Sequence, residues 1–165
     1  MSHPLLEVPH GLFQALIVDL AKAGRGVKES GAFLLGKQES ARRLVTSYLM
    51  YNKVAPESSR SHDYVAFTAE EMARAWEHCY ATGLQVVADV HTHPFGPGQS
   101  ISDRAHPIVS VAGHVALIVP NFAQGAPQPR DLGVHLFGGA GRWQSMFDEE
   151  ARAAIRLTGG NHEPR

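Results

Sequence analysis

Two histidines separated by one residue follow an apolar run, and their spacing could hold a metal ion. The run at 84–90 predicts a buried strand, and His91-Thr92-His93 comes directly after it. Because side chains two residues apart point to the same side of an extended chain, both imidazoles can face one point. Asp103 follows a loop rich in glycine and proline and could add a carboxylate oxygen. Two imidazoles, one carboxylate and a water form the open tetrahedral site typical of catalytic zinc.

The same residues also have a purely structural interpretation. An H-x-H pair can arise by chance in a chain with 10 histidines. Ser100 and Asp103 have the spacing of a helix start, in which a hydroxyl caps the first turn and an acid follows three residues later. Each piece alone is more typical of structure than of function. Together, H-x-H-P at a strand end followed closely by S-x-x-D favours a metal site.

The combination of H-x-H-P, starting at His91, with S-x-x-D, starting at Ser100, resembles the signature of the JAMM (MPN-plus) zinc metalloproteases, the ubiquitin-isopeptidase family. That family also has a glutamate before an apolar strand, in an E-x-x-G-x-L-x-G setting. Residues 29–36 read Glu-Ser-Gly-Ala-Phe-Leu-Leu-Gly and match apart from Ala32, where the family usually has glycine. The resemblance spans roughly residues 10–147. The family usually has one residue more between the proline and the serine than the five found here, residues 95–99.

The resemblance implies a role for each matched residue. His91, His93 and Asp103 would hold one Zn²⁺ per chain, which lowers the pKa of a bound water to about 7. Glu29 would be the general base that takes the proton of that water and passes it to the leaving amine. Ser100 would donate a hydrogen bond to the tetrahedral oxyanion. The shortened loop leaves Ser102 as the alternative donor.

By the same resemblance, the bond cleaved is an amide at the C-terminus of a ubiquitin-like or sulfur-carrier protein. The loop at 121–130 is short, which favours a compact, prokaryotic-type member that acts on an extended tail or a small adduct. One alternative is a related hydrolase of another peptide or of a small amino-acid adduct. A second is a non-catalytic MPN scaffold, which the presence of Glu29 and all three ligands disfavours. A zinc deaminase would need P-C-x-x-C, which a single cysteine excludes.

Length and composition limit the remaining possibilities. The 165 residues predict one domain, expected at 1–157, followed by a flexible tail at 158–165. With 15 basic and 16 acidic residues, the chain gives no sign of binding nucleic acid or an anionic membrane. The single cysteine, Cys79, suits a reducing compartment. No secretory signal or membrane-spanning run is expected, so the predicted location is the cytoplasm.

Hydrophobic periodicity predicts alternating helices and strands. A first amphipathic helix is expected between Pro9 and Gly24, and a second from Thr68, which begins a capping box, to Gly83. The second helix has an apolar stripe that consists of Met72, Ala75, Trp76, Cys79 and Tyr80. A last helix is expected to be capped by Asp148 and to extend through Leu157. Strands are expected at 32–35, 43–52, 64–67, 84–90 and 115–119, with a closing hairpin at 134–137 and 142–147.

These elements predict an α/β fold in which one mixed sheet has helices on both sides. The resemblance implies that this sheet is curved and similar in outline to cytidine deaminases. Asp89 lies two residues before His91 and could orient its imidazole, although a simple strand-end acid is the favoured interpretation. The histidines outside the H-x-H pair, including His114 and His135 beside strands, are expected to be structural.

Overall fold

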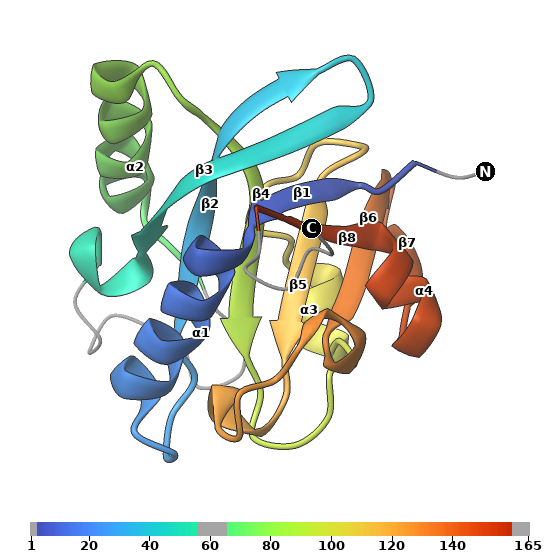
Figure 1. The fold of residues 1–165 in the computed structure, drawn as a ribbon. Helices are drawn as coiled ribbons and strands as arrows, with labels where there is room; N and C mark the ends of the chain where they lie inside the picture. Colours follow the sequence, from blue (N-terminus) through green and yellow to red (C-terminus); the bar gives the residue numbers. More distant parts are fainter. Residues whose placement is uncertain (1–2, 56–65, 160–165) are drawn as a thin grey trace.

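The structure is a computed structural model that describes residues 3–55 and 66–159. Its described residues form one eight-stranded mixed sheet with four α-helices packed around it (Figure 1). The order of strands across the sheet is β7-β6-β5-β4-β2-β3-β1-β8. The predicted α/β class is therefore confirmed.

The strands are β1 Leu6–Pro9, β2 Gly31–Glu39, β3 Arg42–Met50, β4 Gln85–Thr92, β5 Val115–Val119, β6 Gly133–Gly139, β7 Arg142–Met146 and β8 Ile155–Thr158. The α-helices are α1 His10–Gly24, α2 Ala69–Thr82, α3 Ile101–Ala105 and α4 Asp148–Ala154. Short 3₁₀ turns are η1 Tyr51–Lys53, η3 Asn121–Ala123 and η4 Pro129–Asp131.

The pairing of the central strands brings three strand ends to one edge of the sheet. β2 runs antiparallel to β4, so that Gly31 at its start lies opposite His91 near the end of β4. β5 runs parallel to β4 and places Ile118 beside His91. The start of β2 and the ends of β4 and β5 therefore meet at one edge. β2 also pairs antiparallel with β3, and the predicted β6–β7 hairpin is confirmed.

Alternating side chains of β2 separate the core into two layers. Ala32 and Leu34 pack with α1, whose residues Leu16 and Leu20 are buried in the same cluster. On the opposite face, Phe33 packs in a second cluster together with Ala75 and Cys79 of α2. Because successive strand residues point to opposite faces, one apolar strand can serve both layers. Helices therefore cover both faces, as the sequence predicts.

Helix α2 begins and ends where the sequence predicts, but fewer residues of its apolar stripe are buried than the pattern indicates. Thr68 forms the capping box with Glu71, and Gly83 ends the helix with a left-handed φ of 70°. Cys79 is buried, as expected for a packed thiol. Trp76 is 46% exposed and Tyr80 is 92% exposed, so these two residues of the apolar stripe do not lie in the core. The second cluster is small, and it covers only part of the apolar stripe.

The last predicted helix is also wrong beyond Ala154. Residues Ile155–Thr158 form β8, which runs parallel to β1 and pairs Thr158 with Pro9. The hydrogen-bond partner of β8 is β1, a strand that the sequence did not predict. Ile155 is buried and belongs to the core. Thr158 is thus part of the sheet and not of a tail. Asp148 is the first helical residue of α4, whose N-cap position is Phe147.

The predicted strand at 64–67 is not found. Residues 64 and 65 lie outside the described residues, and Ala66 and Phe67 are not in a strand. The ring of Phe67 instead packs against Phe33 and Tyr51, with ring centroids 5.3 and 4.8 Å away. Among the helices of the described residues, none has the length and apolar character that crossing a membrane requires.

Candidate metal centre

The backbone around the two histidines is held by neighbouring strands. His91 lies within β4, and His93 lies just beyond its end. The His93 N–H donates to the carbonyl of Val119 at 2.9 Å, which extends the β4–β5 pairing by one step. The His93 carbonyl accepts from the Phe122 N–H at 2.8 Å. Both histidines are therefore carried by backbone that is fixed on the sheet.

Asp103 reaches the same place from the short helix α3. Ser100 is the N-cap of this helix, and its Oγ accepts from the Asp103 N–H at 3.0 Å. The Asp103 Oδ2 in turn accepts from the Ser100 N–H at 2.9 Å. This reciprocal capping box fixes the carboxylate relative to its own helix. The structural interpretation of S-x-x-D is confirmed, and the capping box also helps to place Asp103 at the histidines.

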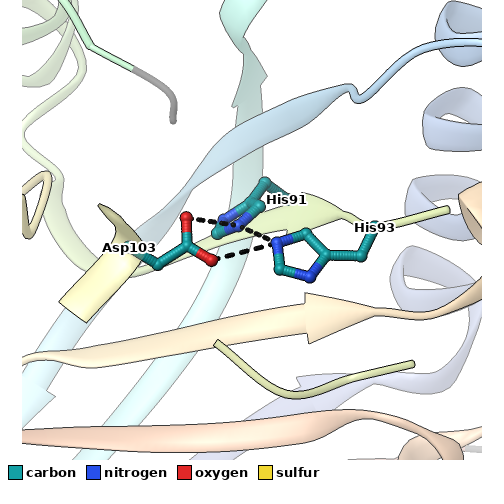
Figure 2. Close-up of side chains that lie close together, drawn as sticks. All are labelled: His91, His93 and Asp103. Carbon is teal, nitrogen blue, oxygen red and sulfur yellow. Dashed lines mark hydrogen bonds and ion pairs between the residues drawn. The ribbon is translucent and has the colours of Figure 1, made fainter. Parts of the chain in front are cut away.

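The three side chains converge on one small volume (Figure 2). The Nε2 atoms of His91 and His93 are 3.0 Å apart. Oδ1 of Asp103 lies 3.5 Å from His91 Nε2, and Oδ2 lies 3.0 Å from His93 Nε2. One ligand atom from each residue lies within 4.8 Å of the other two. His91 and Asp103 are buried, and His93 is mostly covered.

This donor set fits a zinc ion. Ligand atoms about 2 Å from a shared ion in tetrahedral geometry are roughly 3.3 Å from one another. The separations among His91, His93 and Asp103 lie close to that value. Two imidazole nitrogens and one carboxylate oxygen are borderline ligands that zinc accepts readily. The arrangement therefore makes a candidate metal site that supplies three of the four ligands of a tetrahedral zinc ion.

The charges at the centre favour an ionised carboxylate. Burial acts to raise the pKa of Asp103, but hydrogen bonds from His91 and His93 and the charge of His91 hold it far below its usual range. Burial alone would lower the pKa of His91, whereas the hydrogen bond and the charge of Asp103 raise it overall. Asp103 therefore remains a carboxylate, the form that a metal ion needs.

Glu29 lies next to the cluster on the loop that enters β2. Its Oε1 is 3.9 Å from His93 Nε2, and its side chain is 34% exposed. The adjacent Ser30 is held to β4 in both directions, because its N–H donates to Thr92 Oγ1 and its carbonyl accepts from the Thr92 N–H. At Gly31 an added Cβ would be 2.7 Å from the Val90 carbonyl, so the loop and β4 are in close contact.

The environment of Glu29 differs from that of Asp103. Burial raises the pKa of Glu29, although the positive charges of His91 and His93 partly oppose this effect. Glu29 is not one of the residues whose ligand atoms lie within 4.8 Å of one another. A carboxyl group with a raised pKa that stands beside a metal cluster is suited to exchange protons.

The structure therefore brings four of the five predicted site residues together: Glu29, His91, His93 and Asp103. Ser100, the fifth, lies at the N-cap of α3, and its hydroxyl oxygen accepts a hydrogen bond from the backbone N–H of Asp103. The cap uses a lone pair of the Ser100 hydroxyl, so its proton can still be donated elsewhere.

His135, which the sequence predicts to be structural, is fully buried and holds the loop after the histidines. Its Nε2 lies 3.0 Å from the Pro97 carbonyl, and its Nδ1 lies 2.8 Å from Ser145 Oγ. Because a carbonyl only accepts, Nε2 carries the proton, and Nδ1 of the neutral ring then accepts from Ser145. Burial lowers the pKa of His135. His135 and Ser145 are cross-strand partners in the predicted hairpin, which is the signal that could have identified them.

Asp89, two residues before His91, forms another buried pair with His114. The Asp89 Oδ2 is 2.6 Å from His114 Nε2, and both side chains are almost fully covered. Asp89 is therefore paired with His114, whereas the sequence suggested His91 as a partner. His114 lies just before β5, which is next to β4 in the sheet, and this explains how residues 25 positions apart meet.

Comparison with known proteins finds curated relatives and solved structures that are similar to this chain. The chain is 27% identical over 119 residues to the "Probable metalloprotease y4jG" of Sinorhizobium fredii, covering 71% of this chain and 72% of that protein. No family model matches the chain.

The solution structure of a Desulfitobacterium hafniense protein superposes with a TM-score of 0.64 at 15% identity, covering 95% of this chain and 97% of the other. A Salinibacter ruber protein gives a TM-score of 0.61 at 19% identity, with 96% and 95% coverage. These two similarities concern the fold.

Proposed function

We propose that this protein is a zinc metallopeptidase of the JAMM type that hydrolyses an amide bond at the C-terminus of a ubiquitin-like or sulfur-carrier protein. The observation that carries the proposal is the convergence of His91, His93 and Asp103, with Glu29 standing 3.9 Å from His93. The distant similarity to a probable metalloprotease supports metal-dependent hydrolysis. The order Glu29, H-x-H-P and S-x-x-D supports the narrower assignment to JAMM enzymes.

The chain's own residues divide the chemistry between them. When bound, zinc would acidify a water molecule and polarise the carbonyl of the substrate amide. Glu29 accepts the proton from the water and passes it to the nitrogen of the leaving amine. Its partial exposure leaves it reachable for substrate, and burial raises its pKa above the ordinary value of a glutamate. Asp103 and the histidines stay in place because α3 and β4 hold them.

The negative charge that develops on the substrate's carbonyl oxygen needs a hydrogen-bond donor from the protein. Ser100 is exposed at the start of α3, next to Asp103 in the capping box. Its hydroxyl proton can be donated to an oxyanion while Oγ continues to cap the helix. Ser102, one position after Ile101, is the alternative donor.

Features around the centre suit an extended peptide. Phe95 and Ile101 are 86% and 90% exposed on the loop and helix that carry the site. A groove of about 830 Å³ borders the same loop at Pro97 and Gly98 and continues along Asn121 and Arg130. Exposed apolar side chains beside a concave surface are typical of binding sites. An extended tail could therefore lie along this loop with its amide bond at the centre.

A mass-spectrometric screen tests the proposal. The zinc-loaded protein is incubated with a panel of ubiquitin-like and sulfur-carrier proteins, each extended at its C-terminus by a short peptide or a single amino acid. We expect cleavage after the last residue of at least one carrier, and none with the Asp103→Ala protein. Cleavage of free peptides alone would mean that the substrate is a peptide and not a carrier protein. A zinc-loaded protein that cleaves nothing in the panel would contradict the proposal.

A further inference from the structure

The imidazole of His91 has two nitrogens, and only one of them faces the cluster. Nε2 is directed to His93 and Asp103, at 3.0 and 3.5 Å. Nδ1 is buried and has no hydrogen-bond partner among the described residues. When Nε2 binds a metal, Nδ1 carries the proton and needs an acceptor, because a buried N–H without one is costly. Histidines that bind metals almost always donate this proton to a neighbouring group.

A complementary atom is buried at the same place. Oε1 of Gln99 is a buried acceptor that also lacks a partner among the described residues. His91 and Gln99 both line one small cavity of about 20 Å³, together with Asp89, His114 and Trp143. A cavity of that size holds about one water molecule, which needs two to four polar partners. The walls supply a donor at His91 and acceptors at Gln99 and Asp89.

One carboxylate oxygen of Asp89 already has a partner. Its Oδ2 is already 2.6 Å from His114 Nε2 within a buried pair. Gln99 Oε1 lacks such a partner in the described part of the chain, and Gln99 lies directly before Ser100 in the loop that connects the histidines to α3. A hydrogen-bonded connection from Gln99 Oε1 to His91 Nδ1 would therefore join this loop to β4 on the side of the imidazole that faces away from the metal cluster.

We infer that this cavity is the site of one ordered water, which accepts the Nδ1–H of His91 and donates to Gln99 Oε1 and to the Asp89 carboxylate. Gln99 is thereby a positioning residue: it fixes the tautomer and the ring orientation with which His91 presents Nε2. This inference rests on the proposed function only in taking zinc as the bound ion. It adds a residue that contacts neither metal nor substrate.

The test uses Gln99→Met, which keeps the length of the side chain but removes the acceptor, and Gln99→Glu, which restores it. Gln144→Met, at an exposed position on β7, is the matched control. Zinc affinity is measured by competition with a chelator. We expect Gln99→Met to bind zinc about 10–100-fold more weakly, Gln99→Glu to recover most of this loss, and Gln144→Met to equal the wild type.

Nitrogen-15 NMR of the zinc-loaded protein gives a second measurement that does not depend on activity. We expect a slowly exchanging Nδ1–H signal from His91 in the wild type, and its loss or rapid exchange in Gln99→Met. A high-resolution crystal structure of the zinc-loaded wild type, which requires no variant to fold, should contain the water with Gln99 Oε1 within hydrogen-bond distance.

Unchanged zinc affinity with an unchanged Nδ1–H signal in Gln99→Met would overturn the inference, as would a cavity that is dry in the crystal structure. These outcomes differ from failure of the proposed function. A wild-type protein that binds zinc but cleaves no substrate contradicts only the function. A wild type that fails to bind zinc contradicts both.

Discussion

Ser100 combines two tasks that substitutions can separate. Its Oγ accepts from the Asp103 N–H and so caps α3, while its proton is available for an oxyanion. Removing the side chain therefore affects both the position of a metal ligand and the proposed stabilisation of charge. Glycine and alanine differ at this position, because glycine at an N-cap costs only a few tenths of a kcal/mol and alanine about 1 kcal/mol.

Both Ser100→Gly and Ser100→Ala remove the hydroxyl donor, whereas only alanine weakens the N-cap substantially. We therefore expect both variants to lower kcat by the same factor, about 10²–10³, if the loss of the donor is the cause. KM should change less, since the hydrogen bond forms mainly in the transition state. Steady-state kinetics with the substrate found in the screen measures both. If Ser100→Gly kept full kcat while Ser102→Ala lost it, the donor would be Ser102.

At the scale of elements, the centre depends on how β6 and β7 hold the loop after the histidines. An added Cβ at Gly133 would be 2.0 Å from the Pro97 carbonyl, so this loop lies directly on β6. His135 donates to the same carbonyl and is supported by Ser145 on β7. The hairpin therefore fixes the loop that leads to Ser100 and Asp103, although it contributes no side chain to the metal cluster.

The neutral state of His135 makes stability depend on pH. Its folded-state pKa is lowered by burial below the ordinary value of 6.5, so the unfolded chain binds more protons than the folded protein once the pH falls below 6.5. This stability is present above pH 6.5 and is lost as the pH falls towards the folded pKa, by up to about 1.4 kcal/mol for each pH unit.

We expect His135→Gln to be less stable than the wild type at pH 7.5 but to lose less stability between pH 7.5 and 5. Chemical denaturation at several pH values, with equal zinc in all samples, gives the free energies of unfolding. His78→Gln, on the exposed side of α2, is the control and should follow the wild type. Parallel pH profiles for the wild type and His135→Gln would refute the assignment of a buried neutral imidazole.

Local patterns account for what could be predicted from the sequence. The capping box at Thr68, the apolar run before His91 and the turn between β6 and β7 each lie within a few residues, and each is confirmed. The convergence of Glu29 on the histidines followed from a family resemblance, since no local signal links residues about 60 positions apart. The pairing of β2 with β4 explains it physically.

Non-local pairing accounts for what could not be predicted. β1 and β8 are four residues each and lie at opposite ends of the chain. Ile155 and Leu157 extend the pattern of α4, and only the contact with β1 makes them a strand. His114 and Asp89 likewise meet through the parallel β4–β5 pairing. Periodicity describes one segment at a time, so such partners are outside its reach.

At the scale of the whole molecule, a metal ion would cross-link separate parts of the fold. It would join β4, which is central in the sheet, to α3 after a loop of several residues. Zinc at 100 times its Kd should stabilise the folded state by about 2.7 kcal/mol and raise Tm by about 5–10 °C. Differential scanning calorimetry with and without zinc measures this shift.

Variants identify the origin of that shift. Asp103→Ala should remove it, because one ligand is lost. Glu29→Gln should retain it, because Glu29 lies outside the ligand cluster. An equal rise in Tm for the wild type and Asp103→Ala would mean that zinc binds elsewhere.

The most direct test of the central claim is zinc content and cleavage rate measured on one preparation of Glu29→Gln. The amide keeps the size of the side chain and can still hydrogen-bond a water, but it cannot accept a proton at neutral pH. We predict full zinc occupancy and a turnover about 10²–10⁴-fold below that of the wild type. Loss of zinc together with rate would make Glu29 a ligand, and full zinc with full activity would contradict the mechanism.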